Sequence, residues 1–399
     1  MDKETINIYF YSTLCSNHTF ERLFHEHNVK ASIAAQTFYK LLAEGFTLVS
    51  GVNVNVVSTL PINSKEQKKV LWKIPPETEG NINYEYISLI NIPVLRNILV
   101  NLFVFFKIIF KRFPRKATNV ILVDFLRLTI NSSVRLATKI KGIRVLAIVN
   151  DLPGQSVLKN SLVARIRDKF IFKPKYDYYV CVTRQLNEAV NITKKPSILM
   201  ESLVDTKMGY IDNKLANKYD GRVILYAGGL YEGYGIKLLI EAFELFPEKD
   251  LKLWFFGYGP YVNEIINYSK KDNRIQYKGI IPNSEMLEIL TRATLLINPR
   301  PTHEGFSKYS FPSKNLEYMA SGTPLLTTKL PGIPLDHYPY IFLIEEDSIE
   351  GIYQGINNVL SMSKLEIHNF GLDAKEYVLR EKNNIKQAGK IISLLKSNY

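Results

Sequence analysis

The chain has 399 residues, of which 46% are hydrophobic and 22% charged, and its net charge is +13. This composition is that of an ordinary globular protein and excludes a disordered chain, and the length predicts two domains. Cys15 and Cys181 are the two cysteines; they form no metal-ligand spacing, and so low a count favours a reducing compartment. The strand pattern begins within the first few residues, so we expect no secretory signal.

The positive charge is concentrated in the first half of the chain. Residues 1–198 contain 28 Lys and Arg against 14 Asp and Glu, whereas residues 199–399 contain 23 against 24. Such an excess predicts an anionic partner for the first half. Because the sequence has neither zinc-ligand spacing nor an RNP-like aromatic motif, an anionic membrane surface is a better candidate than nucleic acid.

The first half alternates apolar strands with helical patterns. We expect strands at residues 6–12, within 46–57, and at 119–124, 144–149, 178–182 and 197–200. In a doubly wound sheet the loop after the first strand lies at the carboxyl edge, where ligands bind. That loop contains Ser16, Asn17 and His18, which are therefore candidate site residues, although an exposed loop histidine explains His18 equally well.

Asn150 and Asp151 follow a later strand of the same half and are candidates for the same reason. The simpler explanation for Asp151 is a turn aspartate before Pro153, and the two have equal weight.

Residues 91–116 combine an apolar helix with a basic end. The apolar core, 98–106, is too short to span a bilayer, which needs about 20 residues. A helix of this kind can lie in the interface of an anionic membrane. The alternative is a buried core helix whose basic end is favoured by the helix dipole. The basic residues that interrupt or follow the core are Arg96, Lys107, Lys111, Arg112, Arg115 and Lys116.

The second half begins after a polar stretch, 206–221, that we interpret as a linker. Strands are expected at 222–227, 251–256, 275–278 and 294–298, with helices between them and a last helix over about 375–397. This alternation predicts a parallel sheet with helices on both faces. Tight glycine turns, Gly228-Gly229 and the Gly257–Pro260 stretch, follow the first two strands.

The pattern of residues 306–328 predicts a loop, then a helix that ends at a glycine, and then a strand. Pro312 suits the first turn of a helix over 313–320, and Gly322 suits its end. Lys308 and Lys314 flank the helix N-terminus, where free N–H groups favour an anion. Glu317 lies one turn further in, where it could accept hydrogen bonds from paired hydroxyls such as those of a ribose. A surface helix with a solvated Lys and Glu is the simple alternative.

Together these features outline a nucleotide-diphosphate pocket in the second half, with backbone amides and cations facing the phosphates. The residues that we expect to bind this ligand are Gly228, Gly229, Gly257, Tyr258, Gly259, Arg300, Tyr309, Ser310, Pro312, Ser313, Asn315 and Glu317.

The second half resembles the retaining glycosyltransferases of family 4, which have the GT-B fold. The resemblance covers nearly all of residues 199–375 and is carried by the two glycine turns, by Ile297-Asn298-Pro299 and by residues 314–324. It extends more loosely to the first half, through residues 151–153 and 201–205. It implies an α/β fold of two Rossmann-like, doubly wound parallel-sheet domains facing across a cleft. These would be an acceptor-binding domain (1–198), a nucleotide-sugar-binding domain (199–375) and a helix returning to the first domain (376–399).

The sequence departs from the family at two places. The family has a Glu-x7-Glu motif whose second Glu is matched by Glu317, but Tyr309 stands where the first would be, and Glu304 lies 13 residues before Glu317. The Arg and Lys that bind the diphosphate in the family are matched here by Gly229 and Tyr234. Lys308, Lys314 and Arg300 are the expected substitutes. The Tyr-Ser-Phe-Pro-Ser-Lys run resembles a subgroup of bacterial surface-polysaccharide transferases.

The resemblance implies that a sugar moves with retention from a UDP- or GDP-type nucleotide sugar to an acceptor hydroxyl. We expect metal-independent chemistry with no cofactor beyond this co-substrate, because no Asp-x-Asp motif is present and lysines can stabilise the leaving diphosphate. The catalytic candidates are Lys314, Lys308 and Asp151, and the acceptor side would include Ser16, Asn17, His18 and Asn150.

A lipid-linked glycan is the expected acceptor, met by a cytoplasmic protein bound peripherally to the inner face of the cell membrane. Two other functions fit the same pattern. One is a non-catalytic GT-B subunit, which would bind neither UDP nor GDP in calorimetry. The other is a sugar-nucleotide epimerase, which would turn over its donor without any acceptor.

Overall fold

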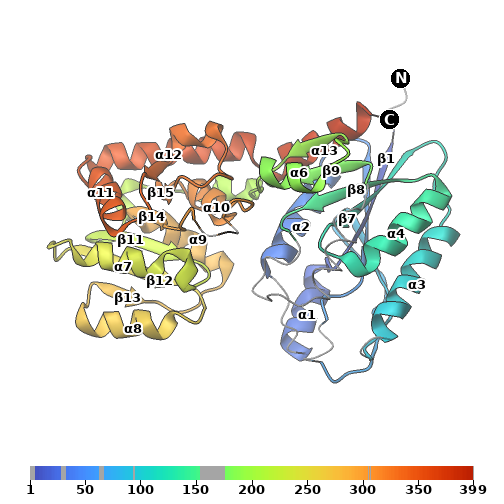
Figure 1. Ribbon diagram of the computed structural model, residues 1–399, viewed down its shortest axis with the longest axis horizontal. Coiled ribbons are helices and arrows are strands. Elements are labelled where there is room, and N and C mark those ends of the chain that lie inside the picture. Colours follow the sequence, from blue (N-terminus) through green and yellow to red (C-terminus); the bar gives the residue numbers. More distant parts are fainter. Residues whose placement is uncertain are drawn as a thin grey trace. The chain divides into compact units, whose positions relative to one another are not determined.

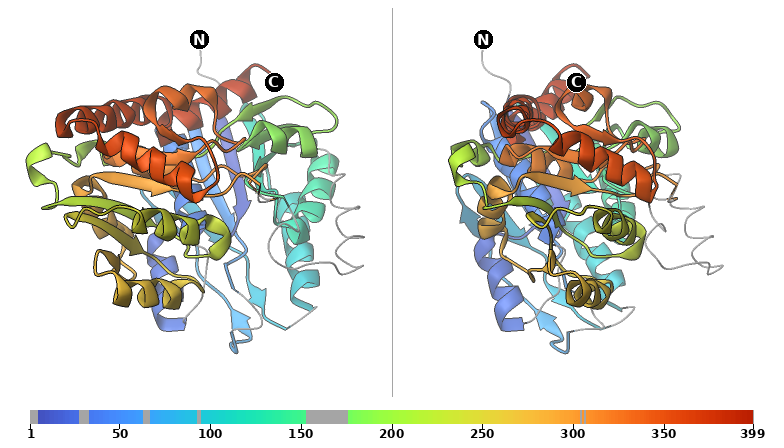
Figure 2. Two further views of the ribbon diagram at one scale, coloured as in Figure 1. Left: turned by 60° about the vertical axis from the view of Figure 1, so that its left-hand side comes forward. Right: turned by 90° about the vertical axis from the view of Figure 1, so that its left-hand side faces the viewer.

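The computed structural model describes residues 5–27, 33–62, 67–92, 95–152, 176–303, 305 and 307–398. The chain forms two compact units, residues 1–200 with 384–399 (unit 1) and residues 201–383 (unit 2). Each unit has a mainly parallel sheet with helices on both faces, as Figures 1 and 2 show. Glu304 and Phe306, which belong to the predicted site motif, and Pro153 lie outside the described residues.

Unit 1 has an eight-stranded sheet in the order β10-β9-β8-β7-β1-β2-β5-β4, and only the β4–β5 pair is antiparallel. Every residue of β1 is buried, as expected of a central strand covered on both faces. The strands are β1 (Ile6–Ser12), β2 (Val52–Ser58), β4 (Glu77–Glu79), β5 (Ile82–Tyr86), β7 (Thr118–Asp124), β8 (Arg144–Val149), β9 (Tyr178–Cys181) and β10 (Ser197–Leu199). A separate two-stranded sheet joins β3 (Leu71–Trp72) and β6 (Leu89–Ile90).

Helices cover the two faces of this sheet. The described helices are α1 (Asn17–His27), α2 (Ile33–Thr47), α3 (Leu95–Phe110), α4 (Leu128–Lys141), α6 (Arg184–Val190) and α13 (Asn384–Lys396). Helix α13 docks on α2 at Gly45, where a Cβ would lie 2.3 Å from the Asn384 carbonyl oxygen. Only glycine allows this approach, so the end of the chain is built into unit 1.

Unit 2 has an all-parallel sheet in the order β13-β12-β11-β14-β15-β16. Its strands are β11 (Arg222–Ala227), β12 (Leu251–Phe256), β13 (Ile275–Tyr277), β14 (Leu295–Asn298), β15 (Leu325–Thr328) and β16 (Phe342–Ile344). Residues of α7 (Ile236–Glu244), α8 (Val262–Lys271) and α11 (Ile349–Leu360) share one apolar cluster with the sheet. Residues of α9 (Asn283–Arg292), α10 (Lys314–Ser321) and α12 (Lys364–Glu381) share another.

Two expectations about the chain were wrong. The last helix, expected over about 375–397, is two helices, because α12 ends where Lys382 turns inward to pair with Glu201 and Asp336, at 3.3 and 3.0 Å. Residues 206–221 are not a linker but part of unit 2. They form the 3-10 turns η1 (Thr206–Tyr210) and η2 (Leu215–Asn217), and the Asn213 amide between them donates to the Ser321 carbonyl at 2.9 Å.

Among the described residues, no helix combines the length and the hydropathy that crossing a membrane requires.

Candidate functional site

The strand order of unit 2 reverses between β11 and β14, and this is the switch point at which an open α/β sheet binds its ligand. Three predicted segments meet there, at the carboxyl ends of the strands. Gly228-Gly229 follows β11, Arg300 follows β14, and Lys314 begins α10. The structure therefore brings together parts of the chain that are more than one strand–helix unit apart.

The two glycine turns pack directly on each other. Gly228 has φ +141°, and a Cβ there would lie 2.6 Å from Lys314 Nζ. At Gly257, with φ +125°, a Cβ would lie 1.9 Å from the Gly228 carbonyl oxygen, and at Gly259 one would lie 2.1 Å from the Leu230 carbonyl oxygen. Close packing thus requires glycine at these three positions.

Lys314 carries its charge beneath the first glycine turn. Its Nζ lies 3.9 Å from the centre of the Tyr226 ring and has no hydrogen-bond partner among the described residues. Desolvation lowers the pKa of this ammonium well below its ordinary value; the charge of Arg300 lowers it further, and Glu317 opposes both. A buried cation without an oxygen partner is costly, and an anion placed beside it removes that cost.

Arg300 supplies a second cation from the loop after β14. Its guanidinium lies over the Tyr234 ring, 4.5 Å from the centre, and donates to Ser310 Oγ at 3.2 Å. Tyr234 stands at the position where the family resemblance places a lysine. Its ring contacts the guanidinium of Arg300, which belongs to the loop after β14. The Arg300 carbonyl also accepts from the Thr328 hydroxyl.

Residues that the sequence prediction missed fix helix α10 in place. The Tyr318 hydroxyl donates to the Ala227 carbonyl at 2.8 Å and accepts from the Ala227 N–H at 2.7 Å, which ties α10 to the end of β11. Asn298, at the end of β14, donates to the buried Asn315 amide oxygen at 2.7 Å. Both residues could have been found from the sequence, because Tyr318 adjoins the predicted site residue Glu317 and Asn298 lies in the Ile-Asn-Pro stretch.

The other residues predicted to bind the nucleotide sugar differ in their exposure. Glu317, Ser313 and Tyr258 are exposed, whereas Pro312 is buried. Lys308 is exposed, with its Nζ 5.6 Å from the centre of the Tyr309 ring, and its role stays a prediction. Over the described residues, no group of three His, Cys, Asp or Glu has the geometry of a metal site.

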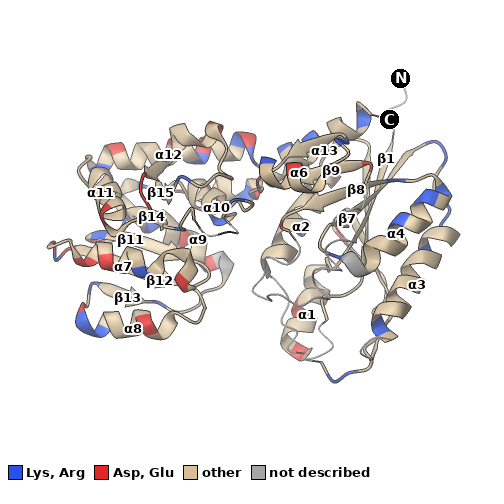
Figure 3. Cartoon of the chain, viewed as in Figure 1, with Lys and Arg blue, Asp and Glu red and all other residues tan. Residues whose placement is uncertain are grey.

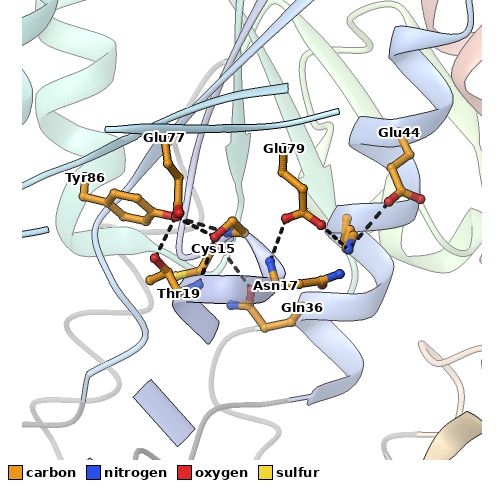
Figure 4. Close-up of polar contacts among 10 residues, drawn as sticks. Cys15, Asn17, Thr19, Gln36, Glu44, Glu77, Glu79 and Tyr86 are labelled. Carbon is orange, nitrogen blue, oxygen red and sulfur yellow. Dashed lines mark hydrogen bonds and ion pairs between the residues drawn. The ribbon is translucent and has the colours of Figure 1, made fainter. Parts of the chain in front are cut away.

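In unit 1 the predicted loop after β1 is bound by carboxylates of the β4–β5 hairpin (Figure 4). The Ser16 hydroxyl donates to Glu77 Oε1 at 2.5 Å, and the Asn17 N–H donates to Glu79 Oε2 at 2.7 Å. The His18 side chain is 76% exposed, and its Nδ1 lies 3.4 Å from Glu77 Oε2. Sequence reasoning missed both glutamates, since they lie some sixty residues from the loop they contact.

The switch point of unit 1 lies between β1 and β7 and holds a second polar cluster. Arg127 donates to Thr13 Oγ1 at 2.8 Å and lies 3.7 Å from the buried Asp124 carboxylate, across the two strand ends. Desolvation raises the pKa of Asp124, and Arg127 opposes this shift. Asn150 donates to the Tyr39 hydroxyl at 3.3 Å. Tyr39 in turn hydrogen-bonds to Asp124, which connects Asn150 to this cluster.

Asp151 makes the contact of a turn residue, because its carboxylate accepts from the Leu152 N–H at 2.8 Å. Its role in chemistry stays a prediction.

Comparison with known proteins bears on the fold and on the class of enzyme. Residues 221–362, within unit 2, match the family of glycosyl transferases group 1. The chain aligns with sucrose-phosphate synthase from Thermosynechococcus elongatus at a TM-score of 0.69 and 14% identity, covering 98% of this chain and 100% of that one. HepE from Anabaena, solved with UDP and glucose, aligns at 0.64 and 13%, covering 98% and 99%. A lipopolysaccharide outer core galactosyltransferase, WaaB, aligns at 0.63 and 13%, covering 98% and 100%.

The fold is therefore GT-B, as predicted. The match to glycosyl transferases group 1, together with this fold, supports a glycosyltransferase. No curated protein matches the chain by sequence.

Proposed function

We propose that the protein is a retaining glycosyltransferase of family 4 that moves a sugar from a nucleotide-diphosphate sugar to an acceptor hydroxyl. The observation that carries the proposal is the Lys314 ammonium, which is buried under Gly228 without an oxygen partner at the switch point of unit 2. A diphosphate laid on the two glycine turns would supply that partner. The backbone amides of the turns would contact the same phosphates.

The chemistry follows from where the cations lie. Charge develops on the diphosphate as the bond to the sugar breaks, and preplaced cations stabilise that charge more in the transition state than in the bound donor. Lys314 takes this role, and Arg300, held by Tyr234 and Ser310, supports it. Two protein cations make a metal unnecessary for neutralising the leaving group. Glu317, exposed on α10, is assigned to the ribose hydroxyls, and Asp151 to orienting the acceptor.

We assign the donor to the UDP- or GDP-sugars. HepE, which has the same fold, was solved with UDP and glucose, and this favours a UDP-sugar over a GDP-sugar as the donor. Calorimetry with UDP and GDP is the direct test: we expect one of them to bind, and to bind much more weakly to Lys314→Met. If neither binds at millimolar concentration, the protein is better described as a non-catalytic subunit.

We further propose that the acceptor is a lipid-linked glycan of bacterial capsule, O-antigen or exopolysaccharide synthesis, met at the inner face of the cell membrane. Helix α3 buries Val100, Val104 and Ile108 but exposes much of its other apolar face. Exposed apolar residues of α3 and the adjacent α4 are Leu95, Ile98, Leu102, Phe103, Phe106, Phe110, Leu136 and Ile140. A patch of this kind on a monomer surface is typical of an interaction site.

The charge around this patch fits an anionic membrane. Helices α3 and α4 contain no Asp or Glu, and Figure 3 shows their Lys and Arg. Glu85 on β5 neutralises part of this charge, because Lys107 and Lys111 lie 2.5 and 3.6 Å from its carboxylate. The salt-sensitive part of membrane binding is thereby assigned to Arg112, Arg115 and Lys116.

A further inference from the structure

A row of asparagines crosses the sheet of unit 1 on four neighbouring strands, β7, β1, β2 and β5. Asn7 on β1 is in register with Asn53 on β2 and with Asn119 on β7, and Asn55 on β2 is in register with Asn83 on β5. Paired residues and residues two apart in a strand share one face of a sheet. Because asparagine is depleted in strands, the stability of the sheet does not explain why so many lie in register.

Most of this row lines a hollow of about 600 Å³ in unit 1, which we call the asparagine hollow. Its lining contains five asparagines together with two threonines, two valines and a glycine. None of these residues carries a charge, although residues 1–198 contain 28 Lys and Arg against 14 Asp and Glu. The asparagines are Asn7, Asn53, Asn55, Asn81 and Asn83.

The asparagine hollow lies at the amino ends of the strands, at the opposite end of the sheet from the switch point of unit 1. Asn7, Asn53 and Asn83 are each the second residue of their strands. The strand β1 (Ile6–Ser12) therefore separates the hollow from the switch point by about 20 Å, at about 3.3 Å per residue. The hollow is thus distinct from the candidate sites described above.

Hydrogen bonds within the row fix the inner amides. Asn7, which is 6% exposed, donates to Asn119 Oδ1 at 3.0 Å and accepts from Asn53 Nδ2 at 3.0 Å. Asn83 Nδ2 donates to Asn55 Oδ1 at 3.5 Å. These bonds use one group of Asn53 and one of Asn55 and hold both side chains in defined orientations.

The remaining amide groups are free to bind a ligand. Asn53 Oδ1, Asn55 Nδ2 and the side chain of Asn81 have no hydrogen-bond partner among the described residues. Asn53 and Asn81 are exposed and Asn55 is half-buried, whereas Val52 and Val54 between them are buried. The hollow therefore offers both donors and acceptors, on side chains that are already positioned.

We propose that the asparagine hollow is a second binding site, for a neutral saccharide. A primary amide presents both a donor and an acceptor, and each sugar hydroxyl also donates and accepts, so the two kinds of group match without any charge. An anion would find no cation in the lining to offset the loss of its hydration. The proposal goes beyond the transferase function and does not depend on it.

Ligand-observed NMR on the full chain tests the proposal, with short neutral oligomers of glucose, galactose, mannose and N-acetylglucosamine as probes. We expect at least one oligomer to bind the wild type, with an affinity that salt does not change because no charge takes part. Asn55→Asp keeps the oxygen that accepts from Asn83 and removes the free N–H groups, so affinity should fall about tenfold. Asn55→Thr should also weaken binding while the protein resists urea as well as the wild type does, because threonine suits a strand.

Asn358→Asp is the matched control, since it makes the same exchange at an exposed position of α11 in unit 2, and it should bind like the wild type. The proposal is overturned if no oligomer binds the wild type, or if both Asn55 variants keep its affinity. Calorimetry with UDP on the same proteins reports on unit 2. Failure of UDP to bind would count against the transferase function without affecting the saccharide result.

Discussion

Lys314 Nζ lies 3.9 Å from the centre of the Tyr226 ring, directly beneath Gly228. The ring face attracts the ammonium and offsets part of its desolvation, but it cannot replace an oxygen acceptor. The proposed site is thus arranged around an amine that is positioned by apolar and aromatic contacts before any donor binds. Substitution of Lys314 should therefore test its role separately from the roles of its neighbours.

Lys314→Met should weaken UDP binding by about tenfold to a hundredfold, the size of a charge-assisted hydrogen bond. The rate of transfer should fall further than affinity, because the diphosphate gains charge as it leaves. Glu317→Ala should mainly weaken donor binding, through lost ribose contacts. Calorimetry and steady-state kinetics measure both effects.

Lys308→Met is the matched control, since Lys308 is an exposed lysine in the segment that precedes α10. Equal losses from Lys308→Met and Lys314→Met would contradict the assignment of the diphosphate to Lys314. Equal and small effects from Lys314→Met and Glu317→Ala would contradict both roles.

Gly228→Ala should displace the Lys314 ammonium as well as strain the turn. The added Cβ would lie 2.6 Å from Lys314 Nζ, at a φ of +141° that favours glycine. We expect a loss of stability of about 1–3 kcal/mol together with weaker UDP binding. Denaturant unfolding measures the first and calorimetry the second.

Gly142→Ala separates these two effects. Gly142 also has positive φ, +68°, but a Cβ there meets nothing within 4 Å. This variant should lose stability while UDP affinity stays at the wild-type value. If both glycine variants keep full affinity, the close contact between Gly228 and Lys314 does not matter for binding.

Lys218 should make the stability of the protein vary with pH in the alkaline range. Its Nζ donates to the carbonyls of Thr291 and Ala293 at 2.8 and 2.9 Å, and desolvation lowers its pKa to about 7. Between about pH 7 and its unfolded pKa of about 10.4, the unfolded chain binds the proton more tightly than the folded chain. The contribution of Lys218 to stability therefore rises with pH, by at most about 1.4 kcal/mol per pH unit, and is constant below about pH 7.

The difference between wild type and Lys218→Met isolates this contribution from the other groups that titrate in the same range. Urea unfolding at several pH values should show a wild-type advantage that grows from neutral to alkaline pH. A difference that stays constant over this range would show that the folded protein keeps Lys218 protonated.

Membrane association should depend on both the apolar and the basic parts of the α3 region. Flotation with anionic liposomes should recover the wild-type protein at low salt. The joint change of Arg112, Arg115 and Lys116 to Gln should reduce binding, since each charge near an anionic surface contributes about 1 kcal/mol. Phe106→Ser with Phe110→Ser should reduce it by removing exposed apolar side chains.

Lys107→Gln with Lys111→Gln is the comparison for the basic residues, because both lysines are engaged by Glu85. We expect a smaller loss from this pair than from the triple change. Binding that is unchanged in high salt, or equal on neutral liposomes, would rule out the electrostatic part of the mechanism.

The sequence by itself determined the parallel sheets, the two glycine turns and the start of α10. These features are local: a short apolar run, a glycine pair or a proline before a helix has the same meaning in most chains. Lys314 and Arg300 could be named from the sequence because each lies within a few residues of a strand or helix end on the ligand-binding edge.

Only the tertiary structure decided which lysine is buried and what contacts the loop after β1. Lys308 and Lys314 look alike in sequence, but packing under Gly228 desolvates Lys314 and leaves Lys308 exposed. Glu77 and Tyr86 reach Ser16 because β4 pairs with β5, β5 with β2, and β2 with β1. No local sequence pattern specifies the register between these strands. The same holds for Lys382, whose pairing with Glu201 spans most of the second half of the chain and ends α12.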